Sequence, residues 1–144
     1  MRITETFVVN APREVVFDYM TDPSKLASWQ TSKTSVEQLT DGPPGLGTRV
    51  RERTKPPGGK EFEQVVEFTE FVRPQRFHVH IVEGPYPVDG NWSLEPSDGG
   101  TRVQFAAEGQ LSGATRLLGP LVARMMARQF AGYHRNLRRN VEAL

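Results

Sequence analysis

The chain of 144 residues contains no cysteine. This excludes disulfide scaffolds, thiol nucleophiles and cysteine-ligated zinc or iron–sulfur sites. It also has little net charge, because 18 Lys and Arg residues are offset by 17 Asp and Glu residues. Such a balance argues against a dedicated nucleic-acid-binding protein, which usually carries a strong basic excess. Long apolar runs are missing too, since Arg116 and Arg124 interrupt the most apolar segment, 111–127.

A membrane-spanning helix needs about 18 or more uncharged residues in a row, and no segment provides them. The first residues, Met1 to Phe7, do not resemble a signal peptide. We therefore expect a cytoplasmic protein without a transmembrane segment. The length suits one domain over residues 1–144, and a chain of this size buries enough surface to fold without a metal.

Apolar and polar residues alternate along much of the chain, which predicts β-strands. Turn-forming Gly and Pro clusters separate most of these strands, as in an antiparallel meander. Two short helices are expected between residues 12 and 29, and a long helix carries an apolar stripe from Val122 to Leu144. The predicted fold class is α+β, a curved antiparallel sheet of about seven strands covered by the long helix. The expected strands are 3–9, 34–40, 47–55, 61–72, 76–83, 87–95 and 101–109.

Several motifs resemble the SRPBCC superfamily, which includes START-related lipid-binding domains and polyketide cyclase/dehydrase-like proteins. The resemblance covers essentially the whole chain. It implies a helix-grip fold, in which the sheet grips the C-terminal helix around a cavity. The motifs are Ala11-Pro12 with Val15-Val16-Phe17, Asp22-Pro23, Trp29, Glu70-Phe71-Val72-Arg73-Pro74 with Arg76-Phe77, and Leu94-Glu95-Pro96 with Gly99-Gly100-Thr101-Arg102-Val103.

Two polar residues stand out from the alternation of the strands. Glu52 shares a strand face with Val50, and Gln64 shares one with Val66 and Phe68, so both are predicted on the buried side of the sheet. A buried carboxylate must be paired, hydrated or functional. Either Glu52 faces a partly hydrated cavity, or it lies at the rim of the sheet and reaches water.

A pocket between the sheet and the long helix would be lined mostly by apolar and aromatic side chains with a few polar groups. The alternative is that the same residues form an ordinary core. Tyr133 is the best polar candidate on the helix, because a buried hydroxyl needs a partner. The predicted ligand-binding residues are Met20, Trp29, Glu52, Gln64, Phe68, Tyr86, Trp92, Met126, Phe130 and Tyr133.

The histidines do not predict a metal site. His78 and His80 lie on the strand face opposite Phe77 and Val79, toward solvent, and no third ligand is evident. His134 falls beside the apolar stripe and is predicted at the surface. On the same outward side of the sheet, one register pairs Arg49 with Glu67 and Arg53 with Glu63 as solvated ion pairs. No cofactor is expected.

Three functions remain open. The first is binding of a small hydrophobic molecule, such as a lipid, polyketide or aromatic metabolite. The second, implied by the resemblance, is a metal-free cyclase, aromatase or dehydratase, with Glu52 as base and Tyr133 as acid. The third, also implied by the resemblance, is a co-chaperone-like interaction module, although the sequence indicates no particular protein partner. Its surface would be a basic helix face made by Arg124, Arg128, Arg135, Arg138 and Arg139.

Overall fold

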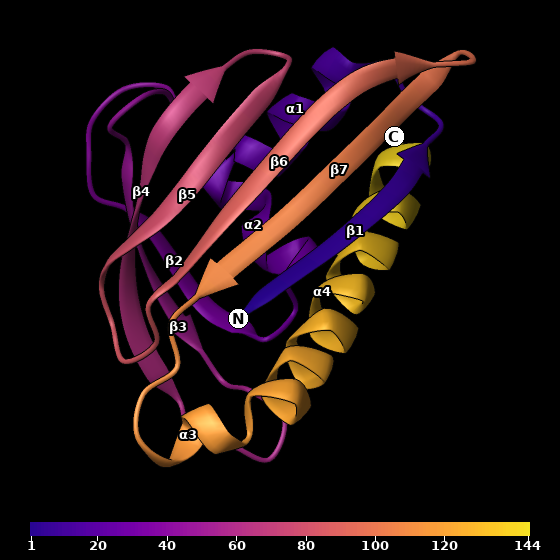
Figure 1. Cartoon of the computed structure of the whole chain (residues 1–144). Coiled ribbons are helices and arrows are strands. Elements are labelled where there is room, and N and C mark those ends of the chain that lie inside the picture. The colour runs from indigo at the N-terminus through magenta and orange to yellow at the C-terminus, as the bar shows by residue number, and fades with distance from the viewer.

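Seven antiparallel strands form one strongly curved sheet in the order β1-β7-β6-β5-β4-β3-β2 (Figure 1). The computed structural model describes the backbone of residues 1–144 and every side chain except those of residues 114 and 115. The strand boundaries differ from the predicted ones by no more than a few residues at each end, the usual uncertainty for strand ends. The strands are β1 (Arg2–Val9), β2 (Lys33–Gln38), β3 (Arg49–Thr54), β4 (Phe62–Val72), β5 (Arg76–Glu83), β6 (Val88–Ser97) and β7 (Gly100–Gly109).

The helices begin where the sequence places helix-starting residues. In the short helix α2, the Asp22 side chain accepts a hydrogen bond from the Ser24 amide, and Pro23 occupies the first turn. In the long helix α4, Pro120 also lies in the first turn, where a proline costs no helical hydrogen bond. The helices are α1 (Arg13–Thr21), α2 (Pro23–Trp29), α3 (Ala114–Leu117) and α4 (Gly119–Glu142).

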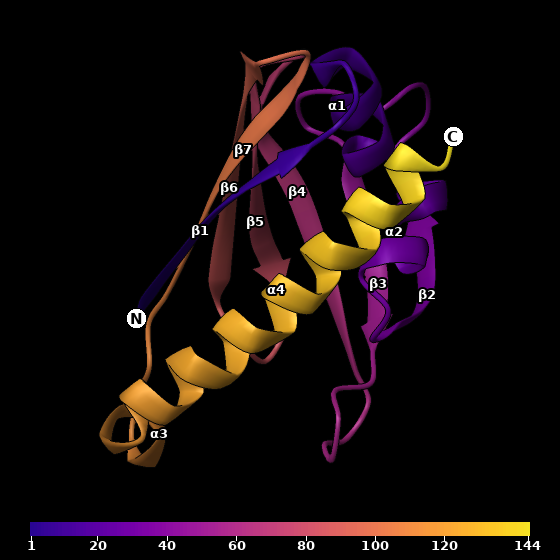
Figure 2. The same cartoon turned by 90° about the vertical axis from the view of Figure 1, so that its right-hand side faces the viewer.

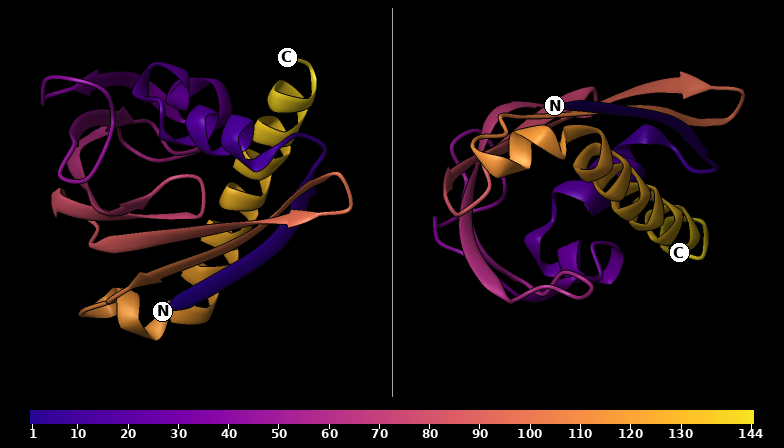
Figure 3. Two further views of the ribbon diagram at one scale, coloured as in Figure 1. Left: turned by 90° about the horizontal axis from the view of Figure 1, so that it is seen from above. Right: turned by 60° about the horizontal axis from the view of Figure 1, so that its bottom comes forward.

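Helix α4 crosses the concave side of the sheet diagonally, and Figures 2 and 3 show the sheet curving around it. Its contacts are mainly with β1 at one edge of the sheet and with α2. This arrangement is the predicted helix-grip fold. The space between α4 and the middle strands is occupied by large side chains, which form the core. Apolar side chains from β1, β4, β5, β6, β7, α1, α2 and α4 meet there in one cluster.

The predicted register of the β3–β4 hairpin is confirmed. Val50 lies opposite Val66, and Glu52 lies opposite Gln64. All four are buried, so strand alternation correctly placed both polar residues on the inner face. On the outer face, Arg49 forms an ion pair with Glu67 at 2.8 Å, as predicted. Arg53 lies opposite Glu63 in the register, but its guanidinium lies nearer to Glu61, at 3.8 Å.

The segments that connect the strands and helices gather at two ends of the molecule. At one end, called the cleft end below, lie the segment 30–32, the loop 55–61, the turn 84–87 and the segment 110–118 (Figures 1 and 2). At the other end, called the far end, lie 10–12, 39–48, 73–75 and 98–99. Since paired strands run in opposite directions, each turn between them lies at one of the two ends.

Candidate functional site

Most of the predicted aromatic and sulfur-containing residues lie in the core. Met20, Trp29, Phe68, Trp92 and Tyr133 are buried members of one cluster. Met126 and Phe130 are partly buried and pack against it. The structure therefore brings seven of the predicted residues together, as a packed set of side chains between α4 and the sheet.

Tyr86 lies apart from this set. The residue is 59% exposed, and its ring packs edge to face on Phe62 with centroids 5.1 Å apart. The reason is local: β6 begins at Val88, and the turn after Gly84 extends to Pro87. Strand alternation could not be extended back to Tyr86, because that residue is not in the strand.

Glu52 and Gln64 form a buried polar pair. The Gln64 amide Nε2 donates to Glu52 Oε1 at 2.8 Å. Lys33 Nζ lies 3.0 Å from the same carboxylate oxygen and donates to Thr54 Oγ1, also at 3.0 Å. The side chains of Lys33 and Glu52 are both buried. Glu52 therefore does not reach water at the rim of the sheet, and its charge is paired inside the fold.

His134 corrects a prediction, because it is fully buried and not at the surface. Its Nδ1 lies 2.6 Å from Glu5 Oε1, and its Nε2 accepts a hydrogen bond of 3.1 Å from the indole N–H of Trp92. Its ring also stacks on Phe7. Position 134 follows Phe130 by four residues and precedes Leu137 by three, so it belongs to the buried stripe of α4. The predicted stripe contains only apolar residues and therefore leaves out His134.

The two ring nitrogens of His134 are both occupied, which bears on its chemistry. Because Nε2 accepts from Trp92, the proton lies on Nδ1 and points to Glu5. The imidazole thus has no free lone pair to take a proton from a ligand. His134 holds the core together and is not placed as a general base.

Tyr133, the next residue before His134, has a different environment. Its hydroxyl shares a hydrogen bond with the Ser32 hydroxyl. Burial raises the pKa of Tyr133 above its ordinary value of 10.0, and the nearby Glu52 charge adds to this effect, while the Ser32 hydrogen bond opposes it. The hydroxyl therefore stays protonated at neutral pH and is able to donate a hydrogen bond.

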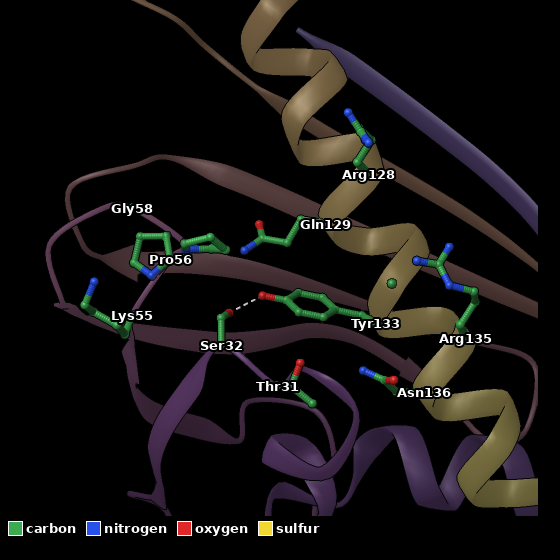
Figure 4. Close-up of a pocket in the computed structure, with 12 residues that line it drawn as sticks. Thr31, Ser32, Lys55, Pro56, Gly58, Arg128, Gln129, Tyr133, Arg135 and Asn136 are labelled. Atoms are coloured by element: carbon green, nitrogen blue, oxygen red, sulfur yellow. Dashed lines mark hydrogen bonds between the residues drawn. The ribbon is translucent and has the colours of Figure 1, made fainter.

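The Ser32–Tyr133 pair lies at the wall of an open cleft of about 520 Å³ (Figure 4). Three segments that are distant in the sequence form it: the turn after α2, the β3–β4 loop and the middle of α4. Its size falls within the usual range for small-molecule sites, roughly 300–1,000 Å³. The lining residues are Thr31, Ser32, Lys55, Pro56, Pro57, Gly58, Arg128, Gln129, Gly132, Tyr133, Arg135 and Asn136.

The cleft is electrically one-sided. Lys55, Arg128 and Arg135 contribute positive charge, and none of the twelve described lining residues is acidic. In Figure 4 the lysine lies on the loop side and the two arginines lie on the helix side. Asn136 joins this wall to α2, since its amide donates to the Trp29 carbonyl at 3.2 Å. The arrangement favours a ligand that carries a negative or strongly polar oxygen group.

Of the predicted site residues, only Tyr133 lines this cleft. The others form the core behind it or, like Tyr86, lie elsewhere. The missed residues come largely from turns and loops, where periodicity carries no signal. For α4, the spacing of Gln129, Gly132 and Asn136 follows one helix edge beside the apolar stripe, and this was the available clue.

The strand histidines lie on the outer face, as predicted. His78 Nδ1 bonds to Thr69 Oγ1 at 3.0 Å, and His80 Nδ1 lies 2.7 Å from Asp89 Oδ1. Among the side chains that the structure describes, no group of three or more His, Asp and Glu residues is arranged to hold a metal ion. Within the same described set, no helix is long and apolar enough to cross a bilayer.

Comparison with known proteins supports the fold and a family. The profile of a family described as "Polyketide cyclase / dehydrase and lipid transport" matches residues 1–142. No curated protein matches the sequence significantly. Among solved structures, TTHA0849 from Thermus thermophilus is 24% identical, with a TM-score of 0.85 over 99% of this chain and 98% of that one.

Two further solved structures share the fold at lower identity. A START superfamily protein from Mycobacterium smegmatis is 17% identical, with a TM-score of 0.81 over 99% of this chain and 97% of that one. Protein CV1439 from Chromobacterium violaceum is also 17% identical, with a TM-score of 0.75 over 98% of this chain and 96% of that one. At these identities the structural matches establish the fold alone.

Proposed function

The chain belongs to the polyketide cyclase/dehydrase and lipid transport family, and from this premise we propose that it binds a small hydrophobic molecule in the cleft beside Tyr133. The ligand carries an anionic or carbonyl oxygen group. The observation that carries the proposal is the one-sided lining of the cleft, with three cations and three hydroxyls close to the aromatic core.

The division of labour follows from the lining. The rings of Pro56, Pro57 and Tyr133 offer apolar surface to the body of the ligand. Burial of that body supplies most of the affinity, at roughly 25 cal/mol per Å² before the costs of association. The oxygen group of the ligand faces Arg128 and Arg135, whose guanidinium groups recognise carboxylates with paired hydrogen bonds.

The last residue of α2 carries an unpaired donor in the core. The indole N–H of Trp29 is buried and has no partner among the described residues. An unpaired buried donor costs about 1–3 kcal/mol. Trp29 ends α2, directly before the segment that supplies Thr31 and Ser32 to the cleft.

The binding test uses two probes with the same chain and different head groups, dodecanoate and dodecanol. We expect dodecanoate to bind more tightly in calorimetric titration. Arg135→Gln weakens dodecanoate severalfold and leaves dodecanol unchanged. The control is Arg138→Gln, a residue of the same helix that is paired with Glu142 and does not line the cleft.

A second variant tests the position of the site. Gly132 lines the cleft, and a Cβ there meets only the Arg135 guanidinium, at an ordinary 3.6 Å. Gly132→Leu should fill the cleft, favour the helix and lower dodecanoate affinity at least tenfold. Ala127→Leu, at an exposed position of α4 outside the cleft, serves as the matched control. Unchanged binding by a folded Gly132→Leu protein would show that the ligand lies elsewhere.

The enzymatic alternative is favoured by one feature, the protonated Tyr133 hydroxyl at the cleft wall. In this alternative the hydroxyl would donate to a ligand carbonyl, as a cyclase or dehydratase requires. Glu52 fits the role of base less well, since Lys33 and Gln64 already share its carboxylate. Incubation with a poly-β-keto thioester and mass spectrometry for the loss of water tests this alternative. Water loss that depends on Tyr133 identifies an enzyme, and binding without it identifies a carrier.

A further inference from the structure

A patch of apolar side chains is exposed where α3 joins α4. Leu117 is 86% exposed, and Leu118, Leu121 and Met125 are each more than half exposed. Single exposed leucines are common on protein surfaces, but a contiguous group is not. We call these four residues the leucine patch. Figure 2 shows α3 and the first turns of α4 at the cleft end of the molecule.

The chain around the leucine patch is strongly basic. Between Glu108 and Glu142 the sequence contains six arginines and no acidic residue. Arg116 and Arg124 are exposed, and they lie next to Leu117 and Met125 in the chain. A helix start that combines exposed leucines with flanking arginines has the composition of a segment that lies in a membrane interface.

A second cleft adjoins the same segment. It measures about 610 Å³ and lies between the start of β1, the end of β7 and the α3–α4 junction. Arg116, Leu111 and Pro120 contribute to its lining, together with both residues at the start of the chain. A hollow with basic and apolar walls beside the leucine patch would accept a phosphate-bearing lipid headgroup.

From this juxtaposition we propose that the leucine patch docks on the surface of an anionic lipid bilayer. The leucines enter the interface, and Arg116 and Arg124 contact the headgroups. Charge selects this occupant over a second copy of the chain, because a two-fold interface would bring Arg116 and Arg124 of one copy close to the same arginines of the other. A nucleic acid would leave the leucines without apolar surface to contact.

The proposal also gives the cleft beside Tyr133 a position relative to the membrane. The β3–β4 loop, which lines that cleft, lies at the same end of the molecule as the leucine patch (Figures 1 and 2). Docking would therefore bring the cleft opening near the bilayer. Membrane docking does not depend on the ligand, so either proposal is able to fail without the other.

The test is cosedimentation of the purified chain with vesicles. One set contains phosphatidylcholine alone, and the other contains equal parts phosphatidylcholine and phosphatidylglycerol. We expect binding to the second set only, weakened by added salt. Arg124→Gln should lower the partition coefficient about fivefold, the effect of one basic residue near an anionic surface. Leu117→Ser with Leu121→Ser should lower it on the order of a hundredfold.

The matched control is Leu46→Ser. Leu46 is 73% exposed and lies in the β2–β3 loop at the far end. This variant should bind vesicles like the unaltered chain, and thermal unfolding should show that all variants fold. Equal binding by the Leu46 and the double-leucine variants would overturn the proposal. So would equal binding to both vesicle sets, or light scattering that shows a dimer that the double-leucine variant dissociates.

Discussion

Trp29 and Trp92 are the only tryptophans of the chain, and their indole N–H groups have different environments in the core. Both are buried, and their rings pack edge to face with centroids 6.3 Å apart. The indole N–H of Trp92 donates to His134, whose other nitrogen lies against Glu5. The indole N–H of Trp29 has no partner among the described residues. The indole N–H of Trp92 is thus hydrogen-bonded within the core, and that of Trp29 is left without a partner among the described residues.

His134 and Tyr133, which are neighbours in α4, also differ in their surroundings. His134 has both of its nitrogens occupied inside the core, whereas Tyr133 reaches the cleft wall and bonds to Ser32. We conclude that burial alone does not mark a functional residue. The useful distinction is whether a buried side chain reaches the wall of a cleft, as Tyr133 does, or is enclosed in the core with its polar atoms bonded, as His134 is.

The largest loss of stability should come from replacing His134. His134→Ala removes the ring between Phe7 and Trp92 and leaves the indole N–H and the Glu5 carboxylate without their partner. We expect the free energy of unfolding to fall by about 3 kcal/mol. Urea denaturation measures this. The comparison variant, Tyr133→Phe, should lose about 1 kcal/mol or less. If the two losses were equal, the contrast between the residues would be wrong.

The tryptophans themselves provide the next test. Trp92→Phe loses ring volume and also deprives His134 Nε2 of its donor, so we expect a loss of about 2 kcal/mol. Trp29→Phe loses similar volume but removes a donor that is unpaired, which offsets part of the cost. Its loss should be smaller by about 1 kcal/mol. Chemical denaturation of both variants under the same conditions gives the difference. A larger loss for Trp29→Phe would indicate a hidden partner for its N–H.

Alkaline pH tests the Tyr133 side of the comparison. Burial raises the pKa of this hydroxyl above 10.0 in the folded chain, so the folded state holds its proton more tightly than the unfolded state does. The stabilisation is fully present below about pH 10 and is lost as the pH rises through the folded-state pKa. Stability measured by denaturation should therefore fall more steeply above pH 10 in the unaltered chain than in Tyr133→Phe. Parallel curves would contradict the raised pKa.

Much of the fold was accessible from the sequence because strands and helices have fixed periods. Alternation placed Glu52 and Gln64 inside, and the observed register puts them opposite each other. The same reasoning failed at Tyr86, since a turn has no period, and at His134, since an apolar stripe has no place for a polar member. A buried histidine becomes predictable only when its partners are known, and Glu5 and Trp92 lie far from it in the chain.

The cleft was harder to predict from the sequence, for a related reason. Its walls come from the turn at Thr31 and Ser32, the loop at 55–58 and the middle of α4, and only the folded chain brings these together. Lys33 was missed because a lysine at the start of a strand looks like a solvated residue. Its burial follows from Glu52, whose carboxylate lies 3.0 Å from it. Pairing of that kind depends on tertiary structure and leaves no local pattern.

The smallest loss of stability is expected on the outer face of the sheet. Arg49 and Glu67 form an ion pair at 2.8 Å, but the arginine side chain is 49% exposed, so water screens the interaction. Removing the arginine as Arg49→Ala should cost about 0.5 kcal/mol or less. Lys33→Met, in contrast, leaves the Glu52 charge buried without its cation and should cost about 3 kcal/mol. Denaturation of both variants at low and high salt separates them further. The small loss should shrink with salt, and the large one should persist, because a buried pair is largely shielded from ions.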